Sequence, residues 1–360
     1  MTIAIQISPG ISNNYRESFN FICFTKIAAE QPSHHFIFIF DKQPGPELKS
    51  GSNCTIVLLL PQIRNRLLNH YWFNYKIPAL LERFNADVFV TAGNTSSIRT
   101  TVPQCMIIEN LSSTQKKNRA YWNKLLPVYV NNAKAICITN PVLESELLRK
   151  YGIEKNRLTI IFPGLSDKNI LNGLKTNEEV KKEYTSGKEY FLYEVRENAL
   201  KQLVIVLKGF SLFKKWFKSD MQLVLFMKRV WGPEISALLS SYKYKDELII
   251  IKEPEQEANI LKAAYTLVIT GNDCKTGLHA MKFGIPVIAE NNSTTKKIFS
   301  EAALLFELNE KNISEKMMIF YKDEHLRMEY ISKGIEVTNQ YSWEITTVQL
   351  WGILRSIAKQ

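Results

Sequence analysis

The stretch that decides the fold runs AAYTLVITGNDCKTGLHAMKFGIPVIAENN over residues 263–292. It is typical of a buried apolar strand, a short polar loop, a helix that opens at Gly277 and closes at Gly284, and a second apolar strand. The loop and the helix start follow the C-terminal end of the first strand. Open α/β sheets bind ligands there, because backbone N–H groups and the helix dipole can hold an anion. The stretch therefore predicts a parallel α/β sheet with an anion site at this loop.

The same alternation of apolar strands and helices extends through most of the chain. Clear strands are predicted at Gln104–Ile108 and Gln222–Phe226, whereas the polar segment 163–188 interrupts the pattern. A length of 360 residues suits two domains. We therefore predict an α/β protein with two doubly wound, Rossmann-like domains that face each other across a cleft. The predicted bounds are 1–165 for the N-terminal domain, 166–188 for a linker, 189–340 for the C-terminal domain and 341–360 for a closing C-terminal helix.

Composition narrows the class of partner only in part. The formal net charge of +11 favours phosphate-bearing partners, which include nucleic acid, anionic lipid and phosphorylated small molecules. The five cysteines are far apart, and no Cys/His cluster has the spacing of a metal site, so we predict a reduced protein without a metal. The N-terminal sequence MTIAIQISPG is typical of a first strand rather than a signal peptide, and the longest apolar runs are too short to span a membrane.

Four strings resemble those of one enzyme family. They are YFLYEVRENALKQLVIVLKGF (190–210), AMKFGIPVIA (280–289), EAALLF (301–306) and YSWE (341–344). In these strings the chain resembles glycosyltransferase family 4 (glycosyl transferases group 1), whose members have the GT-B fold of two Rossmann-like domains. Weaker similarities in the first half, such as LERFNADV (81–88), extend the resemblance over nearly the whole chain.

The resemblance implies an enzyme that transfers a sugar from a nucleotide-diphosphate sugar to a glycan or lipid-linked acceptor. It also implies retention of configuration and no metal or other cofactor. Arg196 and Lys201 match the family's basic pair, which holds the donor diphosphate. Gly277 is predicted to present N–H groups to the same diphosphate by opening the helix. Contacts to the donor nucleotide are implied at Thr276 and His279.

The chain departs from the family at a pair of glutamates, E-x7-E. His279 stands at the position of the second glutamate, which typically holds the donor ribose, and a shortened loop offers Asp273 near the first. Asp273 is therefore one candidate for a catalytic carboxylate. Glu109 is the other, because Glu109 and Asn110 stand where the family has a His-Asp pair. The acceptor side is predicted at residues that replace a family glycine-rich loop and a family His-Asp pair, which are Asn13, Asn14 and Asn110.

Two functions stay open from the sequence. One is the transferase, and the other is a catalytically eroded GT-B paralogue that acts as a binding or scaffold partner, because the glutamate pair is missing. Only net charge favours nucleic acid, so no such partner is predicted. A basic and aromatic cluster comprises Lys116, Lys117, Arg119, Tyr121, Trp122 and Lys124. Such a cluster is typical either of a solvated helix face or of a helix on a membrane surface. The predicted location is cytoplasmic, with peripheral contact at the inner face of the membrane as the alternative.

Overall fold

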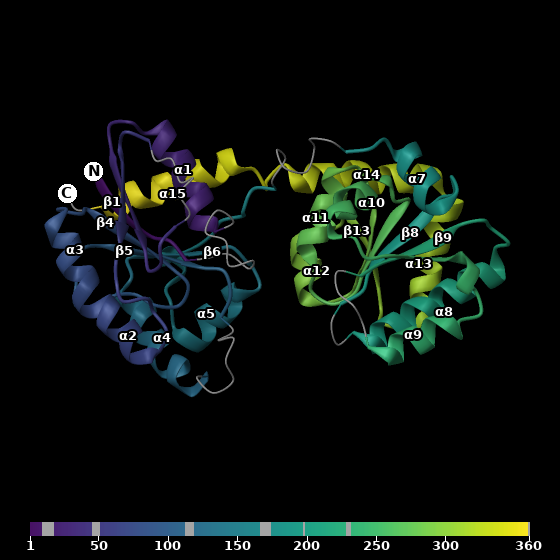
Figure 1. Ribbon diagram of the computed structural model, residues 1–360, viewed down its shortest axis with the longest axis horizontal. Coiled ribbons are helices and arrows are strands. Elements are labelled where there is room, and N and C mark those ends of the chain that lie inside the picture. The colour runs from purple at the N-terminus through teal and green to yellow at the C-terminus, as the bar shows by residue number, and fades with distance from the viewer. Residues whose placement is uncertain are drawn as a thin grey trace. The chain divides into compact units, whose positions relative to one another are not determined.

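The computed structural model describes residues 1–8, 18–44, 51–111, 119–165, 174–196, 199–227 and 232–358, with the backbone alone over 119–123. Two compact units divide the chain (Figure 1). Unit 1 comprises Met1–Gly164 together with Tyr341–Gln360, and unit 2 comprises Leu165–Gln340. Within the described ranges, no helix is both long enough and apolar enough to cross a membrane.

Unit 1 is built on a seven-stranded parallel sheet. Its strand order is β3-β2-β1-β4-β5-β6-β7, so the winding direction changes between β1 and β4. Strands such as HFIFIF are apolar almost throughout, because helices cover both faces of a parallel sheet. The strands are β1 (Thr2–Gln6), β2 (His35–Phe40), β3 (Cys54–Leu58), β4 (Val88–Ala92), β5 (Gln104–Ile108), β6 (Ala135–Ile138) and β7 (Leu158–Ile160).

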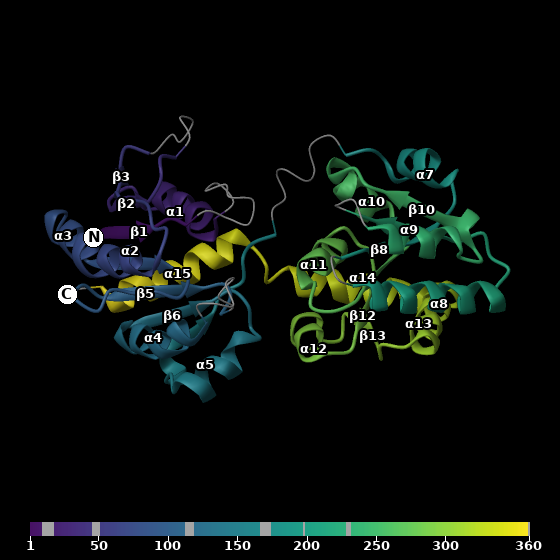
Figure 2. The ribbon, with the colours of Figure 1, turned by 60° about the horizontal axis from the view of Figure 1, so that its bottom comes forward.

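The helices of unit 1 include the C-terminal helix of the chain. They are α1 (Phe19–Glu30), α2 (Arg66–Tyr71), a π-helical turn (Trp72–Lys76), α3 (Ile77–Arg83), α4 (Arg119–Asn132), α5 (Leu143–Tyr151), a 3-10 turn (Lys155–Arg157) and α15 (Trp343–Ile357). Figures 1 and 2 both show α15 beside α1. Leu350 and Leu354 of α15 are fully buried in one core cluster with Phe24 of α1, so this last helix is part of the core of unit 1.

Unit 2 is built on a six-stranded parallel sheet in the order β10-β9-β8-β11-β12-β13, and its winding direction changes between β8 and β11. The strands are β8 (Tyr190–Glu194), β9 (Gln222–Phe226), β10 (Leu248–Ile251), β11 (Thr266–Ile269), β12 (Val287–Glu290) and β13 (Ala303–Phe306). The helices are α7 (Asn177–Thr185), α8 (Leu200–Trp216), α9 (Pro233–Ser240), α10 (Glu257–Ala263), α11 (Cys274–Lys282), α12 (Ser293–Phe299), α13 (Glu310–Lys322) and α14 (Glu324–Thr338), with 3-10 turns at Lys245–Glu247 and Pro254–Gln256.

A close helix pair covers one region of this sheet. Helices α8 and α13 lie side by side in both views (Figures 1 and 2). A Cβ at Gly209 would lie 2.1 Å from Cγ2 of Ile313, so a glycine at this position lets the two helices approach. Phe210 and Phe213 of α8 are fully buried in one core cluster with Phe191 of β8.

The segment predicted as a linker, 166–188, contains a helix instead. α7 (Asn177–Thr185) begins with a capping box, in which Glu179 N donates to Thr176 Oγ1 at 3.3 Å and Thr176 N donates to Glu179 Oε2 at 2.8 Å. Lys175 N also donates to Oδ1 of the buried Asn259 at 2.9 Å, which fixes the start of α7 to α10. The linker prediction was wrong over this helix because α7 buries little apolar surface, and its polar sequence lacks a strong hydrophobic pattern.

Candidate functional site

The C-terminal edge of the sheet in unit 2 brings together three residues that the sequence singled out. β8 and β11 are parallel neighbours, with Val268 paired to Tyr193. The loop after β8 carries Arg196, and the loop after β11 leads through Asp273 into α11, where Thr276 lies in the first turn. Ligands of open α/β sheets bind at the point where the winding direction changes. The topology therefore makes this edge the candidate functional site of unit 2.

An ion pair lies at the centre of this edge. The guanidinium of Arg196 pairs with Oδ2 of Asp273, and the two side chains are 37% and 18% exposed. Asp273 also caps α11, because Thr276 N donates to its Oδ1 at 3.3 Å and Thr276 Oγ1 lies 3.0 Å from its Oδ2. An acid at this position satisfies the helix start and the arginine, which are two groups that attract anions. The cation predicted to hold a diphosphate is thus neutralised within the protein.

Two further carboxylates at this edge escaped the sequence-based prediction. Thr276 Oγ1 lies 3.2 Å from Oε2 of Glu194, the last residue of β8. Gly271 N donates at 2.6 Å to Oε2 of Glu290, the last residue of β12. Asp273, the carboxylate that the sequence identified, is therefore accompanied at this site by Glu194 and Glu290. The missed signal was an acid that ends an otherwise apolar strand, as in FLYE and VIAE.

Buried polar groups line the base of the same edge. The hydroxyl oxygen of Tyr193 lies 2.9 Å from Oγ1 of Thr270, which follows β11. Burial raises the pKa of Tyr193, and the hydrogen bond to Thr270 and the charge of Arg196 oppose the rise. Burial likewise raises the pKa of Cys274 to about 12, against the opposing charge of Arg196. Tyr193 and Cys274 are therefore neutral at pH 7 and serve neither as base nor as thiolate nucleophile.

Gly277 does not open the helix. α11 begins at Cys274, so the predicted helix start was wrong by one turn, and Gly277 is its fourth residue. The N–H of a fourth residue already has an intrahelical acceptor, so it is not presented to a ligand. A Cβ at Gly277 would lie 2.4 Å from Cζ of Phe299 and 2.7 Å from Cδ1 of Ile269. This glycine is required because α11 packs closely on β11 and α12.

Solved structures that are similar to this chain include several glycosyltransferases. A glycosyltransferase from Rickettsia africae is 13% identical with a TM-score of 0.71, over 99% of this chain and 98% of that chain. HepE from Anabaena, in complex with UDP and glucose, is 10% identical with a TM-score of 0.67, over 99% and 100%. WaaG, a glycosyltransferase involved in lipopolysaccharide biosynthesis, is 11% identical with a TM-score of 0.64, over 98% and 99%. The chain has the GT-B fold.

This finding confirms the predicted fold class and the predicted resemblance to proteins of the GT-B fold. The sequence matches no protein-family model and no curated protein. Identities of 10% to 13% establish a shared fold and do not transfer an activity. A function therefore has to be inferred from the side chains at the edge of unit 2, which are Arg196, Asp273, Glu194 and Glu290.

The remaining predicted residues are placed as follows. Lys201 is the exposed second residue of α8, and His279 is half-buried on α11, one helical turn beyond Thr276. Glu109 and Asn110 are exposed directly after β5, at the C-terminal edge of the sheet of unit 1. The structure does not test a contact of any of these with a ligand, so their assigned roles stay predictions.

Some predicted features lie outside the described residues. These are Asn13 and Asn14, and Lys116 and Lys117 of the basic and aromatic cluster, whose residues Arg119, Tyr121 and Trp122 are described by their backbone alone. Across the described ranges, no three His, Cys, Asp or Glu side chains lie close enough together to hold a metal ion.

Proposed function

We propose that this GT-B-fold protein transfers a sugar from a nucleotide-diphosphate sugar to a glycan or lipid-linked acceptor. The observation that carries the proposal is the position of Arg196, a half-exposed cation at the change of winding direction in unit 2, beside the start of α11. That is where open α/β sheets bind phosphorylated ligands. The presence of UDP and glucose in the complex of the similar HepE supports this choice of donor.

The chemistry follows from the groups at this edge. In the transfer, the bond from the anomeric carbon to the diphosphate oxygen breaks, and a bond to an acceptor hydroxyl oxygen forms as that hydroxyl loses its proton. The leaving diphosphate gains negative charge, which the guanidinium of Arg196 stabilises by charge-assisted hydrogen bonds. Arginine suits this role because its planar donors match phosphate oxygens in pairs. Glu194 and Glu290 are the proposed acceptors for hydroxyl groups of the ribose or the sugar.

Four features of the proposal come from the family resemblance. Configuration at the anomeric carbon is retained, and Lys201 adds a second cation to the diphosphate. His279 contacts the nucleotide, and no metal ion takes part. Asp273 is the proposed catalytic carboxylate of unit 2, which gives it two roles, since it also neutralises Arg196 when no donor is bound.

Calorimetry with UDP, GDP, ADP, CMP and their common sugar conjugates tests the proposal. We expect saturable binding of one diphosphate, a loss of that binding in Arg196→Ala and a weakening in Lys201→Ala. Lys208→Ala is the matched control, because Lys208 is exposed on the same helix and lies two turns further along it. Transfer from the bound donor should then proceed in the presence of a metal chelator.

The same titrations separate the transferase from the eroded paralogue. A folded protein that binds none of these compounds would refute the donor site and support a scaffold function. Binding that survives in Arg196→Ala would refute the proposed position of the diphosphate.

A further inference from the structure

A group of large apolar side chains is exposed on one side of unit 1, around α2 and the π-helical turn that follows it. Leu67 is 83% exposed, Tyr71 42%, Tyr75 47% and Ile98 44%. Exposed apolar side chains are normally scattered singly over a protein surface, whereas a continuous group of them marks an interaction site. These four residues are called the tyrosine face below.

Contacts between the side chains show that the tyrosine face is continuous. The rings of Tyr71 and Tyr75 stack, with centroids 5.7 Å apart and planes 26° apart. Leu67 precedes Tyr71 by one helical turn. Ile98 comes from a different segment, but its N–H donates at 2.9 Å to Oδ1 of the buried Asn74, which fixes it beside the π-helical turn. The fold itself therefore holds the two segments of the tyrosine face together.

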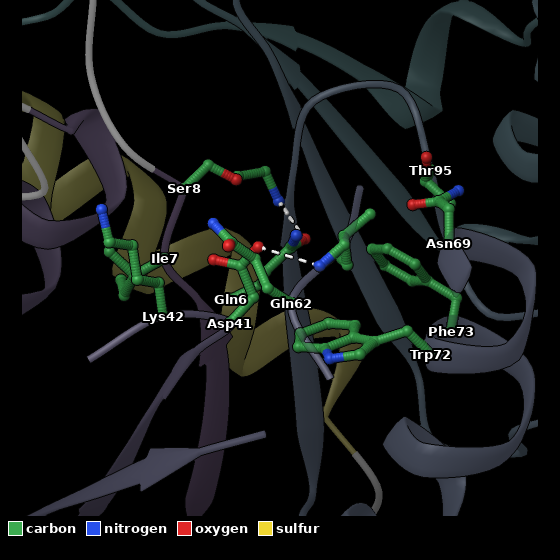
Figure 3. A pocket seen from close by; sticks show the side chains of 12 residues that line it. Gln6, Ile7, Ser8, Asp41, Lys42, Gln62, Asn69, Trp72, Phe73 and Thr95 are labelled. Atoms are coloured by element: carbon green, nitrogen blue, oxygen red, sulfur yellow. Dashed lines mark hydrogen bonds between the residues drawn. The ribbon is translucent and has the colours of Figure 1, made fainter. Parts of the chain in front are cut away.

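The opposite side of the π-helical turn belongs to the interior of unit 1. Trp72 and Phe73 are almost fully buried. In Figure 3 both rings line a pocket of about 360 Å³ beside the ends of β1 and β4, together with amide and hydroxyl groups such as those of Gln6 and Thr95. Trp72 Nε1 donates to Leu59 O at 2.9 Å, which fixes the orientation of the turn. Because this side packs inward, the tyrosines on the other side are held toward solvent.

Three cations accompany the tyrosine face. The guanidinium carbon of Arg99 lies 4.4 Å from the ring centroid of Tyr75, and Nζ of Lys76 lies 5.9 Å from that of Tyr71. Arg64, which is exposed just before α2, is the third. Long cationic side chains can lay their stems along an apolar surface while their charged ends reach polar groups. The surface therefore combines positive charge with exposed apolar groups.

The sequence around this surface carries no negative charge. The chain has no Asp or Glu in residues 48–81 or 88–108, and these ranges contain the whole tyrosine face and its three cations. A partner that matches the surface must offer anions together with an apolar layer. A membrane with anionic phospholipids has both. Nucleic acid has the anions but no apolar layer for Leu67 and Ile98.

We infer that unit 1 docks on an anionic phospholipid surface through the tyrosine face and its three cations. Leu67 and Ile98 enter the boundary between head groups and acyl chains, and the tyrosine rings lie at the level of the head groups. The cations pair with lipid phosphates. This surface is distinct from the basic and aromatic cluster at 116–124. It uses residues of unit 1 alone, so it does not depend on the donor site at Arg196.

Sedimentation of the full chain with phospholipid vesicles tests this inference. One set of vesicles contains phosphatidylcholine alone, and the other contains equal amounts of phosphatidylcholine and phosphatidylglycerol. We expect binding to the anionic vesicles, and this binding should weaken as the salt concentration rises. Leu67→Ser should weaken it about tenfold by removing the most exposed apolar side chain. Arg64→Gln combined with Arg99→Gln should weaken it about 25-fold, because each cation near an anionic surface contributes about fivefold.

The substituted residues are all exposed, so the variants should keep the fold. Two exposed cations elsewhere in unit 1 provide the controls. Arg149→Gln on α5, and Lys124→Gln in the cluster at 116–124, should each bind the anionic vesicles as the wild type does.

Three results would overturn the inference. The first is a wild-type protein that does not bind the anionic vesicles. The second is wild-type binding in both Leu67→Ser and the double arginine variant, and the third is a larger loss in Lys124→Gln than in either of them. A change of oligomeric state in Leu67→Ser with unchanged vesicle binding would also refute lipid docking, and would make the tyrosine face a contact between copies of the chain.

Discussion

Replacing Asp273 by Asn should strengthen the binding of a nucleoside diphosphate. The substitution removes the negative charge that pairs with Arg196, while the amide oxygen can still accept the hydrogen bond from Thr276 N. Asparagine and aspartate are about equally good N-caps, so α11 should keep its start. The change therefore isolates one quantity, which is the charge beside the proposed diphosphate position.

The expected gain has two parts. Breaking a pair whose side chains are 37% and 18% exposed costs little, about 0–1 kcal/mol. The repulsion between Asp273 and one diphosphate charge at about 5–6 Å, with an effective dielectric constant of about 40–80, is about 0.7–1.7 kcal/mol. A total gain of about 0.7–2.7 kcal/mol corresponds to a decrease in Kd of about 3- to 100-fold.

Isothermal titration calorimetry with the diphosphate that the wild type binds best measures this change. Asp220→Asn is the matched control, because it changes the net charge equally at an exposed position of unit 2. The gain should shrink at high salt, since the pair is partly exposed. An unchanged or higher Kd in a folded Asp273→Asn protein would refute the reasoning. If Asp273 is also catalytic, the variant should bind the donor more tightly and transfer the sugar more slowly.

Three further predictions concern stability and can be checked without a ligand. Gly277→Ala should lower the free energy of unfolding by about 1–3 kcal/mol, since its Cβ would lie 2.4 Å from a buried ring; an unchanged Tm would contradict the packing role. Lys214→Met should lower it by about 1–3 kcal/mol in urea titrations, because the buried amine pairs with Glu247, and an unchanged midpoint would exclude this contribution. Hydrogen bonds from Arg327 lower the pKa of Glu324, so its stabilisation is present above the unfolded pKa and is lost as pH falls through the folded pKa. Because Glu324 is exposed, Glu324→Gln should cost less than about 1 kcal/mol near neutral pH and nothing in acid; a difference that persists in acid would show another cause.

The strands could be predicted from the sequence because parallel strands are buried on both faces. The predicted Gln104–Ile108 and Gln222–Phe226 coincide with β5 and β9, and all ten of these residues are buried. The polar helix α7 was missed because only Val180 and Thr185 of it are buried. A local signal was nevertheless present, since Thr176 and Glu179 have the spacing of a capping box.

The candidate site could be predicted only in part, because its geometry depends on contacts between distant segments. Arg196 and Asp273 were each identified by resemblance, yet their pairing follows from the parallel alignment of β8 with β11. The carboxylates of Glu194 and Glu290 end apolar strands, and no family motif marks them. Gly277 was predicted to open a helix and so to contact a phosphate, whereas the structure explains this glycine by packing.

The two units carry different side chains at the same topological position. In each sheet the winding direction changes once, and at that point the loops after two neighbouring strands diverge. In unit 2 these loops carry Arg196 and Asp273, and the carboxylates of Glu194 and Glu290 lie beside them at the ends of β8 and β12. In unit 1 they contribute to a pocket of amides, hydroxyls and an aromatic wall, with a single adjacent pair of opposite charges. A charged leaving group is the ligand that the surface of unit 2 would select, because removing a charge from water requires a compensating charge such as that of Arg196.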